Sequence, residues 1–146
     1  MRLLLDTHAL LWWLSDDRAL SPTARKLIAR GSNTVVVSAA SAWEIATKIR
    51  LGKLTMAANL TMSANLSTDL SPDKAFDLAA DFGSILLQEG FESLPVSVDH
   101  AIRAGLLPGP HKDPFDRMLI AQSQAEGVPI LSDEVVFDGY GIRRLW

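Results

Sequence analysis

The sequence predicts an α/β fold in which helices cover a mainly parallel sheet in three layers. Two observations predict it. Apolar runs of strand length alternate along the chain with segments of helical periodicity, and residues that start and stop helices separate the two kinds of segment. The chain has 146 residues, of which 48% are hydrophobic and 21% charged, so we expect a single globular domain over residues 1–146.

The first 38 residues predict two strands, with two helices between them. Residues 2–5 form an apolar strand, and a helix follows that begins near His8. Ser21 and Pro22 provide an N-cap and a first-turn proline for a second helix, which Gly31 closes. Residues 34–38 are mainly β-branched and predict a strand that is buried on both faces.

The second half continues the alternation from residue 71 onwards. We expect helices over 71–90, 99–106 and 113–127, strands over 94–96, 128–131 and 142–146, and a loop forced by Pro108, Gly109 and Pro110. The first of these helices has an apolar stripe, made by Ala75, Phe76, Leu78, Ala79, Phe82, Ile85 and Leu86.

Residues 55–66 interrupt this rhythm with a duplication, in which TMAANL is followed by TMSANL. Two copies are too few for a solenoid, which needs at least three repeats to bury a core. We therefore expect residues 55–70 to be an inserted surface loop, because lengthening a loop costs little additional closure entropy.

Acidic residues follow the predicted strands closely, and they are the main functional signal. They are Asp6, Glu44, Asp116, and either Asp133 or Glu134. The carboxyl ends of parallel strands meet at one edge of a sheet, so these acids can converge on one crevice. Carboxylates that lie close together repel each other unless a divalent cation compensates their charge. A set of ligands that offers only oxygen atoms suits Mg²⁺ or Mn²⁺. The pattern points to metal-dependent phosphodiester chemistry.

Each acid also has a structural interpretation. Asp6 could cap the helix that follows it, and Ser41 with Glu44 matches a capping box. Asp113 is the better cap of its helix, while Asp116, three residues on, suits the positive end of the helix dipole and can point inward. The acids after Leu131 could simply solvate a turn.

Charge and composition narrow the function classes. The net charge is −3, so contacts to a nucleic acid would have to be local. The absence of cysteine excludes disulfides and thiolate sites. No apolar segment is long enough to span a membrane, and we expect a soluble, cytoplasmic protein. The basic residues available for local contacts are Arg25, Lys26, Arg30, Lys48, Arg50, Lys53, Lys112 and Arg117.

Other catalytic patterns have little support. His8, His100 and His111 lack the spacing of zinc ligands, and there is neither a Gly-x-Ser-x-Gly elbow nor a phosphate-binding P-loop. A phosphoacceptor receiver domain would have two adjacent acids after its first strand, where this chain has Asp6 alone. The four tryptophans could stack on bases, although core or dimer packing is the more ordinary role.

Several segments together resemble the PIN-domain family, and within it the VapC toxins of bacterial VapBC toxin–antitoxin pairs. They are residues 6–13 (DTHALLWW), 38–48 (SAASAWEIATK), 51–54 (LGKL), 111–122 (HKDPFDRMLIAQ) and 140–146 (YGIRRLW). The resemblance implies a PIN-like α/β/α sandwich. It also implies that the protein is an endoribonuclease whose activity depends on Mg²⁺, or alternatively on Mn²⁺. It also implies an RNA substrate, a VapB-type antitoxin as inhibitor, and a homodimer.

The resemblance places the family's first three acids on Asp6, Glu44 and Asp116. The fourth is open: a position two residues after the serine that ends the strand selects Glu134, and a register one residue shorter selects Asp133. The alternative function on the same fold is a non-catalytic RNA-binding or scaffold protein, which we would expect to lack one or more of these acids.

Overall fold

The protein is built around a five-stranded, all-parallel sheet with the strand order β3-β2-β1-β4-β5. The computed structural model describes residues 1–52 and 72–146. The strands are β1 (Arg2–Leu5), β2 (Thr34–Ser38), β3 (Glu92–Leu94), β4 (Ile130–Leu131) and β5 (Arg144–Leu145). The helices are α1 (Thr7–Leu14), α2 (Pro22–Ala29), α3 (Ala39–Arg50), α5 (Pro72–Glu89), α6 (Val98–Leu106), α7 (Pro114–Glu126) and the 3-10 helix η1 (Val135–Tyr140).

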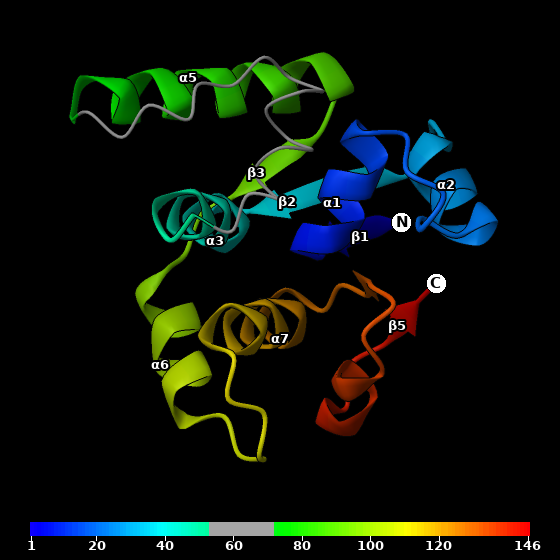
Figure 1. Cartoon of the computed structure of the whole chain (residues 1–146). Coiled ribbons are helices and arrows are strands. Elements are labelled where there is room, and N and C mark those ends of the chain that lie inside the picture. The colour runs from blue at the N-terminus through cyan, green and yellow to red at the C-terminus, as the bar shows by residue number, and fades with distance from the viewer. Residues whose placement is uncertain (53–71) are drawn as a thin grey trace.

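Helices cover both faces of the sheet, which confirms the predicted three-layer arrangement. In Figure 1, α1, α2 and α5 lie on one side of β1 and β2, and α6 and α7 lie on the other. Side chains alternate along each strand accordingly: Leu5 and Val37 join the core beneath the first group, while Leu4 and Val36 join the core beneath the second. The central strands are thus buried on both faces, as their β-branched and apolar sequences predict.

The helix boundaries follow the capping residues. Ser21 accepts a hydrogen bond from the backbone N–H of Ala24, and Ser97 caps α6 through the N–H of His100. Helix α7 ends at Gly127, whose left-handed backbone has φ +64°. Helix α5 ends one residue before Gly90, and its predicted stripe is confirmed at Phe82, Ile85 and Leu86, which are buried.

The expected bounds of three strands were wrong. The strand expected at 94–96 is β3, Glu92–Leu94, and the strand expected at 128–131 contains only Ile130 and Leu131. Proline explains both ends: Pro95 and Pro129 have no N–H to donate to a neighbouring strand, so pairing stops after Leu94 and begins after Pro129. The last strand, expected over 142–146, is likewise limited to β5.

Some expectations concern residues outside the described part of the chain. These are the duplication at 55–66, the inserted loop expected over 55–70, Lys53, and the side chains of Ala75, Phe76, Leu78 and Ala79. Within the described residues, no helix combines the length and apolar character that a membrane crossing requires.

Candidate active site

The candidate site lies at the carboxyl edge of the sheet, where the strand order reverses. Strand β1 pairs with β2 on one side and with β4 on the other, so the chain leaves β1 at a topological switch point. In open α/β sheets, ligands bind in the crevice beside such a point. Asp6 follows β1 directly, and Ser132 follows β4 directly.

Asp6 is the first candidate acid at this edge of the sheet, and it is only 3% exposed. Its Oδ1 accepts a hydrogen bond of 2.8 Å from the backbone N–H of Ala9, and its Oδ2 accepts one from the Ser132 hydroxyl. Asp6 is therefore the N-cap of α1 as well as a member of the site, so the structural interpretation is correct without excluding the functional one.

The environment of Asp6 disfavours its charged form. Burial raises the pKa of Asp6 to about 6, and the negative charge of Asp116 adds to the rise. The hydrogen bonds from Ser132 and Ala9 and the charge of His8 oppose it. Because burial disfavours the charged carboxylate of Asp6, a cation beside it would stabilise that charged form.

Glu44 enters the crevice from the second turn of α3 and is 5% exposed. Burial raises the pKa of Glu44, and the charges of Asp113 and Asp116 act in the same direction, against the Thr7 hydroxyl and the Lys48 ammonium group. The capping-box interpretation of Ser41 and Glu44 was wrong. Helix α3 begins at Ala39 and is capped by Ser38, whose hydroxyl accepts the N–H of Ala40 at 2.9 Å, so Glu44 is free of any role at the helix start.

Asp116 lies in the first turn of α7, as predicted, and Asp113 caps that helix by accepting the N–H groups of Phe115 and Asp116 at 2.9 and 3.0 Å. Burial raises the pKa of Asp116, and the neighbouring Asp113 charge raises it further. His111 opposes this rise, because its Nε2 lies 2.7 Å from Asp116 Oδ2. The charge of Asp116 thus raises the pKa of both Asp6 and Glu44, although the three acids lie after β1, on α3 and on α7.

Asp133 and Glu134 are both exposed. The N–H of Glu134 donates to the Ser132 hydroxyl at 3.0 Å, so the turn that carries both acids is fixed to the oxygen that also holds Asp6. The pKa of Arg144 is raised, chiefly by its hydrogen bond to Asp138 and to a smaller extent by the charge of Asp133. Asp133 therefore faces Arg144 in part, and the choice of the fourth acid stays a prediction.

In the described ranges, no three histidine or acidic side chains lie close enough together to hold a metal ion directly. The donor chemistry nevertheless fits a hard divalent cation, since the three acids offer only carboxylate oxygens and all have raised pKa values. Mg²⁺ typically keeps several waters and needs one or two carboxylates from the protein, so three direct ligands are not required.

Sequence reasoning missed three residues that support the acids. Ser132 served only to mark the end of a strand, His111 was considered only as a zinc ligand, and Arg117 as a nucleic-acid contact. The Arg117 guanidinium instead donates to the carbonyl oxygens of Leu107, Gly109 and His111, and so fixes the loop that carries His111. His100 is buried and structural, bonding to Ser97 and to Glu126 at 3.0 Å.

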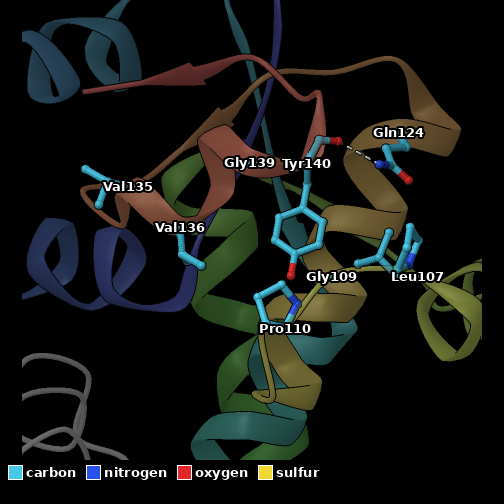
Figure 2. A pocket seen from close by; sticks show the side chains of 9 residues that line it. Leu107, Gly109, Pro110, Gln124, Val135, Val136, Gly139 and Tyr140 are labelled. Atoms are coloured by element: carbon cyan, nitrogen blue, oxygen red, sulfur yellow. Dashed lines mark hydrogen bonds between the residues drawn. The ribbon is translucent and has the colours of Figure 1, made fainter.

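A pocket of about 670 Å³ lies beside this loop rather than over the acids. In Figure 2 the Tyr140 ring reaches down to Gly109, and the Tyr140 carbonyl accepts a hydrogen bond from Gln124. The Tyr140 hydroxyl also accepts the N–H of His111 at 3.0 Å. The pocket has no acidic, basic or histidine side chain in its lining and is therefore separate from the candidate carboxylates. Its lining residues are Leu107, Pro108, Gly109, Pro110, Gln124, Val135, Val136, Gly139 and Tyr140.

Comparison with known proteins identifies the class. The model of the PIN domain family matches residues 3–141, and the chain belongs to that family. No curated protein sequence matches the chain.

Three of the solved structures that share this fold are described below. VapBC2 from Rickettsia felis, solved with a DNA fragment from its promoter, has a TM-score of 0.61 at 13% identity and covers 99% of this chain and 98% of its own. FitAcB from Neisseria gonorrhoeae has a TM-score of 0.56 at 14% identity, covering 99% and 96%. Mycobacterium tuberculosis VapC20, described as a sarcin–ricin loop cleaving toxin, has a TM-score of 0.54 at 17% identity, covering 96% and 95%. The predicted PIN fold and its likeness to VapC proteins are confirmed.

Proposed function

We propose that this chain is a divalent-metal-dependent endoribonuclease that cleaves single-stranded or structured RNA. One observation carries the proposal. Three carboxylates from separate segments, Asp6, Glu44 and Asp116, lie near the switch point of a PIN fold; the charge of Asp116 raises the pKa of the other two, and burial raises the pKa of each. Burying several like charges is unfavourable unless a cation compensates them.

Mg²⁺ is the expected ion and Mn²⁺ the alternative, held through one or two of Asp6, Glu44 and Asp116, with Asp133 or Glu134 as a further candidate. Such an ion would polarise a phosphate and lower the pKa of a water nucleophile. The chain's own groups prepare the site. Ser132 and the Ala9 N–H fix both oxygens of Asp6, and His111 fixes the rotamer of Asp116 through its 2.7 Å contact.

RNA cleavage with purified protein tests the nuclease function. Deleting a group that stabilises transition-state charge removes a large part of the rate, so Asp116→Asn should lower cleavage by about 10² or more. Glu92→Gln is a matched control, because it makes the same change of charge at an exposed position. Glu92 is the first residue of β3 and so lies at the amino end of that strand, away from the carboxyl ends where the acids lie. Undiminished cleavage by Asp116→Asn, or in excess chelator, would exclude the mechanism, and RNA binding without cleavage by the unaltered protein would favour the scaffold alternative.

We also propose that the chain is the toxin of a toxin–antitoxin pair, inhibited by a small VapB-type antitoxin, and that it forms a homodimer. The acidic crevice supports this, because an inhibitor can satisfy it with an arginine, whose planar group pairs bidentately with carboxylate. Expression of the chain alone should slow bacterial growth, and co-expression with a neighbouring small open reading frame should restore it. Unaffected growth together with failure to recover a small partner would count against the toxin role without touching the nuclease assignment.

A further inference from the structure

Trp43 differs from the other three tryptophans, because its side chain is open to solvent. Trp12 packs between His8 and Trp146 at ring-centroid distances of 5.5 and 5.8 Å. Trp13 packs on Phe91 and donates its indole N–H to Glu89 at 2.8 Å. Trp43 is 56% exposed. Large aromatic side chains are usually buried, so an exposed indole is informative, and its position on the surface indicates what kind of partner binds there.

The indole of Trp43 lies over the same two helices that supply two of the site acids. Trp43 immediately precedes Glu44 on α3, and it packs edge to face against Phe115, with ring centroids 4.7 Å apart and planes at 73°. Phe115 immediately precedes Asp116 on α7. Glu44 and Asp116 in turn lie close enough for the charge of one to shift the pKa of the other. The exposed ring therefore packs on α7 one residue before Asp116 and lies on α3 one residue before Glu44, which places it near these two acids.

The neighbours of Trp43 along α3 leave its ring uncovered. The residues one turn before and one turn after it, Ala39 and Ala46, are exposed and too small to shield an indole. Arg50, seven residues on, lies on the same helix face and is also exposed. A flat aromatic surface with a cation two turns away is the combination with which proteins bind single-stranded nucleic acids, stacking a base on the ring and pairing a backbone phosphate with the cation.

We propose that Trp43 is the stacking platform for one nucleobase of the RNA substrate, adjacent to the phosphate that the acids address, with Arg50 contacting the backbone beyond it. This proposal rests on the nuclease function proposed above. Stacking on an aromatic side chain tolerates every base, so Trp43 contributes affinity and position rather than sequence selection. Of the three aromatic anchors that α1 and α3 offer, Trp43 alone combines exposure with a place beside the carboxylates.

Direct binding tests the proposal without relying on turnover. The Asp116→Asn protein is titrated with a fluorescein-labelled single-stranded RNA of about ten nucleotides, a length within the usual site size. Adding Trp43→Ala should weaken binding roughly 5- to 100-fold, as expected for the loss of one stacked base, and Trp43→Phe should retain most of the affinity. Leu87→Ala is the matched control, since it removes an apolar side chain that is 81% exposed on α5.

A second measurement identifies the base by combining changes in the RNA with Trp43→Ala. Each nucleotide of the RNA is replaced in turn by an abasic one. At a single position the loss should match that of Trp43→Ala, and there the two changes together should cost no more than either alone.

Unchanged affinity in Trp43→Ala, or losses that add independently at every abasic position, would overturn the stacking role. So would a Trp43→Ala protein that binds RNA normally but loses self-association or antitoxin binding, because the ring would then be a protein contact. If the unaltered protein neither binds nor cleaves RNA, the nuclease proposal fails as well, and that result is distinct from the others.

Discussion

Replacing Asp6 by asparagine should make the metal-free protein more stable at neutral pH. Asp6 is buried, and its pKa rises from the usual 3.8 to about 6 in the folded protein. The folded state therefore holds this proton more tightly than the unfolded state. Stability from Asp6 is greatest below about pH 4, falls as the pH rises from there through about 6, and is lowest above it. A rise of about two pKa units corresponds to about 3 kcal/mol of destabilisation at pH 7.5, as an order of magnitude.

The asparagine side chain removes this penalty while retaining an oxygen that can accept the Ala9 N–H. It forfeits the acceptor for the Ser132 hydroxyl, at a cost of about 1 kcal/mol. We expect Asp6→Asn to exceed the unaltered protein by about 1–2 kcal/mol at pH 7.5, and to fall below it by about 1 kcal/mol at pH 4. The order of stability should thus reverse between these pH values.

Urea unfolding at several pH values between 4 and 8, with chelator present, measures the difference directly. Glu92→Gln, at an exposed position, controls for the general effect of removing a negative charge. A difference between Asp6→Asn and the unaltered protein that does not change with pH, or an asparagine variant that is the less stable at pH 7.5, would refute the reasoning. Adding Mg²⁺ or Mn²⁺ should close the gap by stabilising only the protein that retains Asp6.

Three further predictions concern the residues around the acids. Ser132→Ala should lower metal affinity about 10- to 100-fold, measured by titration calorimetry, because it frees the Asp6 carboxylate. Arg117→Ala should lower the free energy of unfolding by about 1–3 kcal/mol in urea, because it leaves three carbonyl oxygens of the 107–111 loop without their donor. Gly109→Ala should lower the melting temperature, since a Cβ there would lie 2.8 Å from the Tyr140 ring at a backbone φ of +98°. Unaltered metal affinity, unfolding free energy or melting temperature, respectively, would contradict each prediction.

The sequence was sufficient to predict the order of strands and helices in the described ranges, because local signals determine it. Caps such as Ser21 and Asp113 and the stop at Gly127 act within a few residues of the helix end they define. Strand lengths were less predictable. Ile130 and Leu131 form a strand because β1 pairs with them on one side and β5 on the other, and that pairing depends on how the whole sheet assembles. The 3-10 helix η1 has too weak a periodicity to be noticed in the sequence.

The site was predictable where a residue type is tied to a strand end, and unpredictable where it depends on contacts across the fold. Asp6 and Asp116 were selected by their positions and by the family resemblance, and their catalytic role stays a prediction. The hydrogen bond from Ser132 to Asp6 joins residues that are 126 positions apart, and no local sequence pattern predicts it. Glu44 shows the opposite problem: Ser41 matches a helix cap in sequence, yet the helix begins earlier, at Ala39, and Ser38 is its cap.

The central place of β1 also determines when its sheet can be completed during synthesis. A ribosome delivers Arg2–Leu5 long before Ile130 and Leu131, so one edge of this strand stays unpaired until those residues emerge and bring Ser132 to Asp6. Contacts this distant in sequence form late, because the intervening chain has to close a long loop. If the chain is the ribonuclease proposed above, its nascent form lacks an assembled crevice for most of translation, so the message that encodes it and the ribosome that reads it are exposed to the active enzyme only after folding is complete.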